Sequence, residues 1–133
     1  MKTLLLLLML ALPCWAAELN TNFVAAIHRV ETGGRVGKIL GDNGKALGPL
    51  QIHKVCWQDA VEFDKSLSGA YSDCERLDYS IKIMTAYLNR YARKAIVSND
   101  YETLARVWNG GPNGTAKSAT ITYWHKVRAN MKL

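Results

Sequence analysis

The chain alternates short amphipathic stretches with glycine-rich turns, a pattern typical of a small, mainly helical domain. Apolar residues recur at intervals of three and four over residues 23–30, which predicts a first helix with one apolar face. Asn20 or Thr21 can cap its start. Gly33 and Gly34 can end it, because glycine accepts the left-handed conformation that ends helices.

The pattern changes after this helix. Short apolar runs flank the turn sequence GDNG at residues 41–44, and Asn-Gly is a strong hairpin motif, so we expect a small β-hairpin there. Helical periodicity then returns, and Asp100 is a candidate cap for the helix expected over residues 101–108. The further helices are expected over residues 53–63, 76–92, 101–108 and 120–131. The predicted fold class is α+β, mainly helical, with one small antiparallel β-hairpin beside the first helix.

The first residues have the features of a secretory signal peptide. Lys2 supplies the positive start, residues 4–12 are almost uninterrupted leucine, and small residues surround a cleavage point after Ala16. The apolar run is too short to span a bilayer. We therefore expect a signal peptide over residues 1–17 and one secreted or periplasmic domain over residues 18–133, without a stable membrane anchor.

The formal net charge of the whole chain is +6, and removal of Lys2 with the signal segment takes away one positive charge. A basic exported protein favours anionic partners, a class that includes cell-wall glycan, nucleic acid and phospholipid head groups. No long block of consecutive lysines or arginines suggests a nucleic-acid-binding stripe, so we expect no nucleic-acid partner.

Cys14 lies in the predicted signal segment, which leaves Cys56 and Cys74 as an even pair in the exported domain. A disulfide is the favoured interpretation, because disulfides persist outside the cytosol. Two buried free thiols are the alternative. Two cysteines without zinc-type histidine spacing do not predict a metal site, and we expect no cofactor.

Two carboxylates suggest a chemistry. Glu31 lies at the end of the first helix and Asp42 lies in the predicted hairpin turn. Glycoside cleavage needs one protonated carboxyl that donates to the departing oxygen and one ionised carboxylate that attacks or stabilises the anomeric carbon. A carboxyl packed among apolar neighbours has a raised pKa, whereas one on a solvated turn stays ionised. Glu31 is therefore the candidate acid and Asp42 the candidate anion, although either alone could be a surface charge.

Two polar segments are candidates for sugar binding. Gln51, within GPLQI at residues 48–52, carries an amide that can donate and accept hydrogen bonds at once. A buried glutamine that binds backbone is the simpler interpretation. Asn109, Gly110 and Gly111 would let a flat ligand approach bare backbone, although glycines that merely stop a helix give the same pattern.

The aromatic residues Trp108 and Tyr123 offer flat faces on which pyranose rings could stack. Burial in the core is the alternative for each.

Several motifs, in the same order along the chain, resemble the invertebrate-type lysozyme (destabilase) family. They are Glu31-Thr32-Gly33, Asp42-Asn43-Gly44, GPLQI at 48–52, YLNRY at 87–91, ARVWNGGPNG at 105–114 and YWHKV at 123–127. Shorter blocks are similar to the soluble lytic transglycosylase and goose-type lysozyme families. All of these families share the lysozyme-like fold.

The resemblance implies a peptidoglycan-cleaving muramidase. Glu31 would be the general acid and Asp42 the second carboxylate in hydrolysis of the β-1,4 bond between N-acetylmuramic acid and N-acetylglucosamine, or of a chitin-like saccharide. Gln51, Asn109 and Gly110 would lie in the saccharide cleft. A proteinaceous lysozyme inhibitor is a further expected partner, and we expect a monomer.

The chain also departs from the family pattern. The family is rich in cysteine, whereas this domain keeps two, and Ala46-Leu47 stands where the family has serine and cysteine. Trp108 replaces the histidine before the Asn-Gly-Gly block. The isopeptidase activity of some family members involves such serine and histidine positions, so we do not extend it to this chain.

Two rival functions remain open. In a lytic transglycosylase, Glu31 acts as acid and then as base, the 6-hydroxyl of the sugar attacks, and Asp42 is dispensable. In a glycan-binding or inhibitor-binding domain that keeps the fold, neither carboxylate does chemistry.

Overall fold

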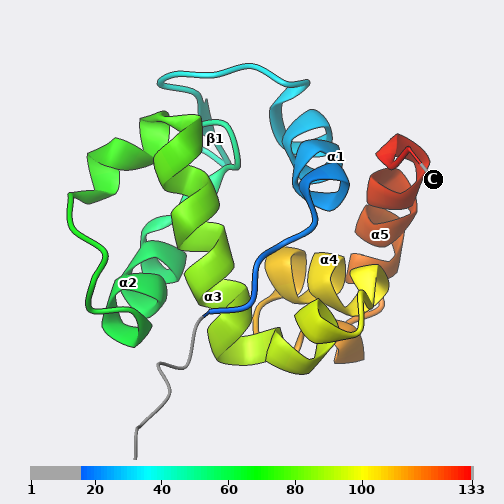
Figure 1. Ribbon diagram of the computed structural model, residues 1–133. Coiled ribbons are helices and arrows are strands. Elements are labelled where there is room, and N and C mark those ends of the chain that lie inside the picture. Colours follow the sequence, from blue (N-terminus) through cyan, green and yellow to red (C-terminus); the bar gives the residue numbers. More distant parts are fainter. Residues whose placement is uncertain (1–15, 133) are drawn as a thin grey trace, which may run out of the picture.

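The computed structural model describes residues 16–132, so most of the predicted signal peptide lies outside the described residues. The described part contains five α-helices, two short 3₁₀ helices and one three-stranded sheet (Figure 1). In chain order these are α1 (Thr21–Thr32), β1 (Leu40–Gly41), β2 (Ala46–Leu47), β3 (Ile52–His53), α2 (Lys54–Phe63), η1 (Tyr71–Glu75), α3 (Leu77–Val97), α4 (Tyr101–Gly110), η2 (Gly114–Ala116) and α5 (Ala119–Asn130). The predicted α+β, mainly helical fold class is confirmed.

Helix α1 has the caps that the sequence predicted. The Asn20 side chain accepts hydrogen bonds from the backbone N–H groups of Asn22 and Phe23, which satisfies donors that no helical turn can pair. Gly33 ends the helix in the left-handed conformation, with a φ of 66°. Glu31 lies within the last turn, at the end of the helix as the sequence predicted.

The predicted hairpin is formed by β1 and β2, which pair in antiparallel register with Leu40 opposite Leu47. Asp42 and Asn43 both have left-handed backbone conformations, with φ of 48° and 55°, in the connecting turn. Asn and Asp adopt this conformation more readily than other residues with a side chain.

The third strand was not predicted. β3 pairs with β2, placing Ala46 opposite His53. Helix α2 therefore begins at Lys54, one residue after the predicted start.

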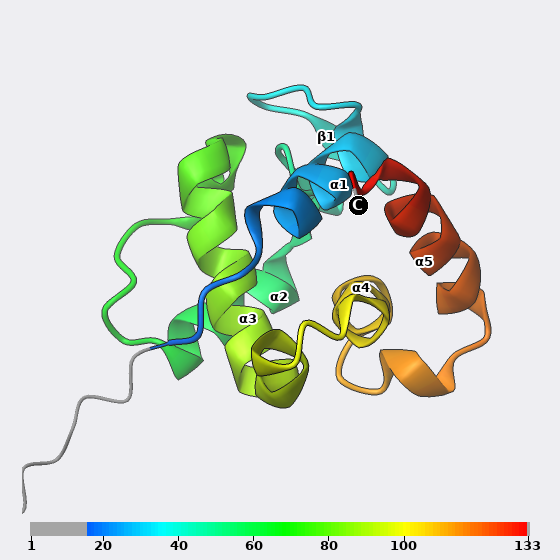
Figure 2. The ribbon, with the colours of Figure 1, turned by 45° about the vertical axis from the view of Figure 1, so that its right-hand side comes forward.

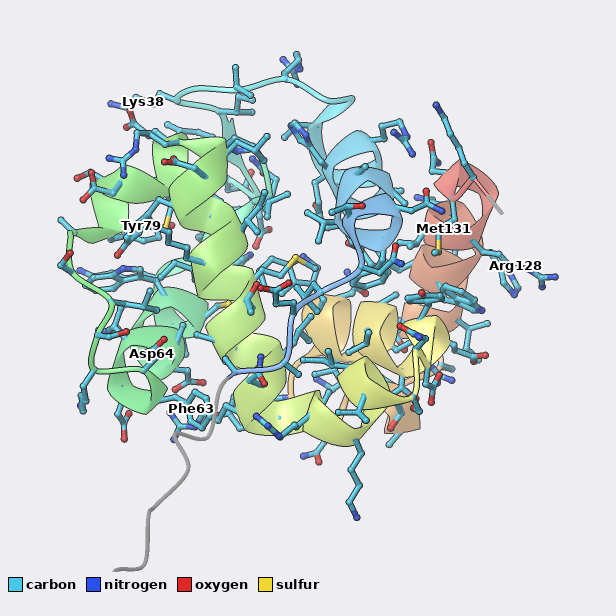
Figure 3. All side chains as sticks on the ribbon, viewed as in Figure 1. Lys38, Phe63, Asp64, Tyr79, Arg128 and Met131 are labelled. Atoms are coloured by element: carbon cyan, nitrogen blue, oxygen red, sulfur yellow. The ribbon has the colours of Figure 1, made fainter. Side chains whose placement is uncertain are left out.

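Helix α3 runs through the middle of the molecule and packs against α2 and α4 (Figure 1). Tyr79, labelled in Figure 3, accepts a hydrogen bond from the indole N–H of Trp57 at 3.1 Å, which joins α3 to α2. The predicted end of this helix at residue 92 corresponds to a break: Ala92 has non-helical φ and ψ of −144° and 32°, and the helix continues beyond it to Val97.

The two ends of the described chain are both held to helices. Ala17 donates its backbone N–H to Asn89 Oδ1 at 3.0 Å, and Asn89 Nδ2 donates to the Ala17 carbonyl at 2.8 Å. At the other end, Asn22 on α1 and the backbone of Lys132 exchange two hydrogen bonds. Figure 2 shows the C-terminal end beside α1.

Helices α1 and α5 pack against each other and form one side of the molecule (Figure 2). Met131, just after α5, is buried between them, while Arg128 extends outward (Figure 3). The core is apolar, and its fully buried side chains include Phe23, Ile27, Leu50, Ile83, Met84, Leu88 and Val127. Within residues 16–132, no helix is both long enough and apolar enough to cross a membrane.

Candidate active site

A cavity of about 620 Å³ brings both candidate carboxylates together. Glu31 reaches it from the last turn of α1, and Asp42 reaches it from the turn between β1 and β2. The cavity is also lined by five of the residues that the sequence suggested for sugar binding. These are Gln51, Trp108, Asn109, Gly110 and Gly111. Residues far apart in sequence thus share one concave site, which is the usual form of a saccharide-binding cleft.

The Glu31 carboxyl is partly buried and accepts a hydrogen bond from the Tyr123 hydroxyl, with 2.6 Å between Tyr123 Oη and Glu31 Oε1. Burial raises the pKa of Glu31, because the charged form loses hydration. The hydrogen bond from Tyr123 acts in the opposite direction and is the smaller effect. Glu31 therefore keeps its proton to a higher pH than a solvated glutamate does, as a general acid requires.

Tyr123 has a different place from the one its aromatic ring suggested. It lies on α5, is absent from the residues that line the described cavity, and points its hydroxyl at Glu31. Burial, the negative charge of Glu31 and the hydrogen bond to it all raise the pKa of Tyr123 well above its ordinary value. The phenol therefore remains a hydrogen-bond donor throughout the pH range in which Glu31 titrates.

Asp42 occupies a much wetter position. Its side chain is 57% exposed, and Oδ2 lies 3.3 Å from Nε2 of His53, whose side chain is itself 50% exposed. An ion pair this open to solvent contributes at most about 1 kcal/mol. The hairpin thus presents Asp42 without withdrawing it from water, which suits a carboxylate that must be ionised.

Gln51 borders the cavity but uses its amide within the sheet region. Nε2 donates to the carbonyl of Ile39 at 3.1 Å and to that of Gly48 at 2.9 Å, so both amide hydrogens are engaged. Gln51 itself has a φ of 52°, a left-handed conformation that these bonds help to hold. The backbone-binding interpretation of this glutamine is therefore the one that its contacts support.

Close contacts tie the segment after β2 to the helix carrying Glu31 on one side and to η1 on the other. The buried hydroxyl of Thr32 donates to the Pro49 carbonyl at 2.8 Å. Gly48 has a φ of 79°, and a Cβ at this position would lie 1.8 Å from the carbonyl oxygen of Cys74. The segment that follows the hairpin is therefore held in place by close contacts with both α1 and η1.

The opposite wall comes from the end of α4 and the segment after it. Trp108 is half-buried and meets Tyr87 edge to face, with ring centroids 5.9 Å apart. Asn109 is exposed, and Lys117 Nζ donates to the Gly110 carbonyl at 2.6 Å. These groups offer a flat ring, an amide and a cation to a ligand in the cavity.

Several ionisable residues that line the cavity were not predicted as catalytic or sugar-binding residues, among them His53, Asp59 and Lys117. His53 follows GPLQI directly, so its position after a candidate binding motif was the one available clue. Asp59 and Lys117 also line the cavity, but nothing in their local sequence distinguishes them from surface charges.

Cys56 and Cys74 are free thiols in the structure. Cys56 lines the cavity from α2, and Cys74 is buried in η1. Burial raises the pKa of both thiols, that of Cys74 to about 12, and the charge of Cys74 adds to the shift at Cys56. Their disulfide stays a prediction. No group of three or more His, Cys, Asp or Glu side chains within the described residues is arranged to hold a metal ion.

Comparison with known proteins decides the family. The family model described as Destabilase matches residues 21–130, which include both carboxylates and every cavity wall. The chain belongs to the destabilase family. The resemblance inferred from the motifs is thereby confirmed.

Several invertebrate lysozymes are similar to this chain in sequence. Lysozyme 1 of Crassostrea virginica is 36% identical over 105 residues, a match that covers 77% of this chain and 55% of that protein. This chain therefore spans about half the length of that relative. Lysozyme of Ostrea edulis is 27% identical over 126 residues, with 93% of this chain and 90% of that protein covered.

Two solved structures have the same architecture. The crystal structure of Tapes japonica lysozyme matches with a TM-score of 0.66 and 27% identity, covering 86% of this chain and 93% of that one. Meretrix lusoria lysozyme, solved in complex with Aeromonas hydrophila PliI, matches with a TM-score of 0.68 and 28% identity at the same coverage. The lysozyme-like fold is thus supported by structure as well as by sequence.

Proposed function

We propose that this protein is a muramidase that hydrolyses the β-1,4 bond between N-acetylmuramic acid and N-acetylglucosamine in peptidoglycan. The observation that carries the proposal is the shared cavity, in which a desolvated carboxyl and a solvated carboxylate are both presented. Two carboxyl groups in unlike settings are the requirement for glycoside cleavage. The family and the lysozyme names of the relatives agree with it.

The roles follow from these settings. Glu31 donates its proton to the glycosidic oxygen, and the bond from that oxygen to the anomeric carbon breaks with its electron pair going to the oxygen. Asp42 attacks the anomeric carbon or stabilises its positive charge. A water molecule then completes hydrolysis and returns a proton to the Glu31 carboxylate, which acts as the base in this second step.

The separation of the two carboxyl groups distinguishes the forms of hydrolysis. Direct attack by Asp42 requires about 5 to 5.5 Å between the carboxyls of Glu31 and Asp42 with saccharide bound. A water-mediated inverting reaction requires roughly 6.5 to 9.5 Å.

The remaining cavity residues provide saccharide contacts. Trp108 can stack on a pyranose ring, and Asn109 can bind a hydroxyl or acetamido group. Gly110 and Gly111 let the sugar approach the backbone, because a side chain would occupy that space. The same contacts would accept a chitin-like saccharide, which carries the same acetamido groups.

One observation favours a lytic transglycosylase as the alternative. Asp42 is more than half exposed and is paired with His53. A reaction in which the 6-hydroxyl of the sugar attacks needs Glu31 alone and would tolerate an aspartate placed in this way.

Mass spectrometry of the fragments released from purified peptidoglycan separates the candidates. Fragments with reducing sugar ends are expected if the protein is a muramidase. Fragments with 1,6-anhydro ends would show that it is a lytic transglycosylase instead. If the protein binds glycan but releases no fragments, the proposed chemistry is wrong and a binding domain remains.

Export of the protein follows from the signal peptide predicted at residues 1–17. Ala17 is bound to Asn89 through both of its backbone groups, so cleavage after Ala16, one residue before the end of the predicted segment, would leave Ala17 at the start of the folded domain. Amino-terminal sequencing of the secreted or periplasmic protein tests this position. Sedimentation of the same material tests the expected monomer.

A proteinaceous inhibitor is the expected protein partner. Meretrix lusoria lysozyme was solved with the protein PliI bound, and a protein that covers the cavity of the present chain would exclude glycan from Glu31. Titration of the active enzyme with purified PliI, followed through the rate of wall lysis, tests this expectation. A rate that does not change at saturating PliI would contradict it.

A further inference from the structure

We propose that Tyr123 is the positioning residue of the general acid, which binds Glu31 Oε1 and leaves Oε2 as the oxygen that delivers the proton to the glycosidic bond. The inference rests on the proposed function and assigns to Tyr123 a role distinct from sugar stacking. Tyr123 acts through Glu31 and does not itself meet the substrate, since it is not among the residues that line the described cavity.

The contact joins two elements that are far apart in the chain. Glu31 is in the last turn of α1 and Tyr123 is near the start of α5, and 92 residues separate them. The two helices pack directly against each other. The 2.6 Å distance between Tyr123 Oη and Glu31 Oε1 is therefore held by the core and not by a flexible loop.

Buried neighbours fix the position of the Tyr123 ring. One turn earlier on α5, Thr120 is buried and its hydroxyl donates to the Gly114 carbonyl at 2.8 Å. One turn later, Val127 is fully buried in the core. Tyr123 lies between these two anchors, so its hydroxyl has little freedom to leave Glu31.

The direction of the hydrogen bond assigns a role to each carboxyl oxygen. The phenol keeps its proton, because burial and the neighbouring carboxylate raise the pKa of Tyr123, so Tyr123 donates and Oε1 accepts. In a neutral carboxylic acid the carbonyl oxygen is the better acceptor, and the proton resides on the other oxygen. The transferable proton is therefore on Oε2.

The same hydrogen bond becomes stronger during the reaction. When Oε2 gives its proton to the glycosidic oxygen, the breaking bond leaves its electrons on that oxygen, and one negative charge develops on the Glu31 carboxylate. The hydrogen bond from Tyr123 is then charge-assisted, which makes it roughly twice as strong as a neutral one. Tyr123 thus stabilises the carboxylate more than the acid and limits the rise in pKa that burial causes.

Other ionisable groups share the cavity with Glu31. They are Asp42, His53, Cys56, Asp59, Tyr87 and Lys117. Across residues 16–132, none of them forms a hydrogen bond or ion pair with the Glu31 carboxyl, and Tyr123 is the one side chain that does. On α1 itself, Nε2 of His28 lies 2.7 Å from the Arg35 carbonyl oxygen and is directed away from this contact. Tyr123 is therefore the direct electrostatic partner of the acid.

The test is Tyr123→Phe, which keeps the ring and removes the hydroxyl. Because the hydroxyl stabilises the carboxylate, its loss raises the pKa of Glu31, and the alkaline limb of the kcat/KM profile should move to higher pH. At the optimum we expect kcat to fall by roughly tenfold, less than the hundredfold or more expected when the acid itself is removed, with KM unchanged. A ¹³C NMR titration of the Glu31 carboxyl should show the raised pKa without any turnover.

Tyr71→Phe is the matched control. It also removes a tyrosine hydroxyl that donates a short hydrogen bond, here to the Ile52 carbonyl at 2.7 Å. A loss of stability without movement of the alkaline limb is expected for this control. Replacement of Tyr123 by 3-fluorotyrosine keeps the hydroxyl as a stronger donor, and it should move the limb and the NMR titration to lower pH even if Tyr123→Phe does not fold.

The outcomes separate this inference from the proposed function. The positioning role would be overturned if the two variants at position 123 kept the wild-type alkaline limb of the kcat/KM profile and the wild-type NMR titration of Glu31. A raised KM with an unchanged kcat would instead make Tyr123 a sugar contact. If the wild-type protein cleaves no glycan, the proposed function fails, while the NMR titration still decides whether Tyr123 controls Glu31.

Discussion

The helical wall that carries Glu31 and the hairpin wall that carries Asp42 place the same chemical group in opposite surroundings. Glu31 is inside a helix, desolvated, and bound by a hydroxyl from a residue 92 positions away. Asp42 begins a four-residue turn whose first three residues have left-handed backbone conformations, and its side chain is 57% exposed. The setting of the proposed acid is thus produced by long-range packing, and that of the proposed anion by local turn geometry.

This difference determines what disturbs each wall. The Glu31 wall depends on the contact between α1 and α5, which is part of the hydrophobic core. The Asp42 wall depends on a sheet whose strands have two residues each, held by the Gln51 amide and by the close approach of Gly48 to Cys74. The hairpin wall therefore depends on specific backbone contacts, whereas the helical wall is held by the packing of apolar side chains.

The largest effect is expected for Glu31→Gln, which removes the acid. An amide cannot donate the proton that the leaving oxygen needs, so the rate of wall lysis should fall at least about a hundredfold, the lower end of a general-acid contribution. Glu62→Gln is the control, because this exposed carboxylate lies on α2 away from the cavity. Retention of more than roughly a hundredth of the wild-type rate would refute the assignment of Glu31 as the acid.

The same variant tests the burial of Glu31 through stability. The folded-state pKa of Glu31 is raised, so its carboxyl contributes stability that is fully present below the unfolded-state pKa and is lost as the pH rises through the folded-state pKa. Melting temperatures of wild type and Glu31→Gln should therefore diverge in favour of the variant as the pH increases. Parallel melting curves at all pH values would contradict a desolvated carboxyl.

On the hairpin side, Gly48→Ala should lower the free energy of unfolding by about 3 kcal/mol, combining a steric collision with the cost of a left-handed alanine. The new Cβ would meet the Cys74 carbonyl oxygen at 1.8 Å. Gly44→Ala separates the two terms, because its φ is 83° but no atom lies within 4 Å of the new Cβ. Denaturant unfolding should show a cost of about 1 kcal/mol for this control, and equal losses in the two variants would exclude the collision.

The thiol pair beneath the hairpin wall gives the next effect. If Cys56 and Cys74 form the predicted disulfide after export, neither should react with a thiol reagent until reduced, and reduction should cost roughly 2 to 4 kcal/mol of stability. Alkylation followed by mass spectrometry measures the reactivity of the thiols. Melting with and without reductant measures the stability lost on reduction. Prompt alkylation of both cysteines in the native, unreduced protein would contradict the disulfide, whereas alkylation of both only after unfolding without reductant would leave two buried thiols as the correct interpretation.

Asp42→Asn should have the smallest but most discriminating effect. Turnover should fall about tenfold or more if the carboxylate attacks or stabilises the anomeric carbon, since the amide lacks the negative charge. The side chain is exposed, so the melting temperature should stay unchanged. Unchanged turnover together with 1,6-anhydro products would assign the reaction to the transglycosylase.

Features that depend only on neighbouring residues could be predicted from the sequence. Glycine at position 33 ends α1 beside Glu31, and the Asp-Asn-Gly turn presents Asp42, because both signals act over three or four residues. The helix cap at Asp100 was predicted for the same reason. Local backbone chemistry was therefore sufficient to identify both carboxylate-bearing elements.

The parts that were missed depend on contacts between distant residues. The hydroxyl of Tyr123 meets Glu31 only after α5 has packed on α1, and no local pattern on α5 indicates that partner. The Gln51 amide hydrogens are engaged by two carbonyls of the hairpin segment, and these particular partners could not be identified from the sequence. Strand β3 has two residues, too few for an alternating pattern to be visible.

Because the chain is synthesised from its N-terminus, Glu31 is made long before its partner Tyr123. A nascent chain that stops just before Ala119, the first residue of α5, already contains Glu31 and Asp42. It lacks the helix whose Tyr123 binds the Glu31 carboxyl. Contacts across 92 residues form late, because the intervening loop must first be closed. The setting of the proposed acid is therefore complete only after the chain has been made beyond Tyr123 and α5 has packed on α1.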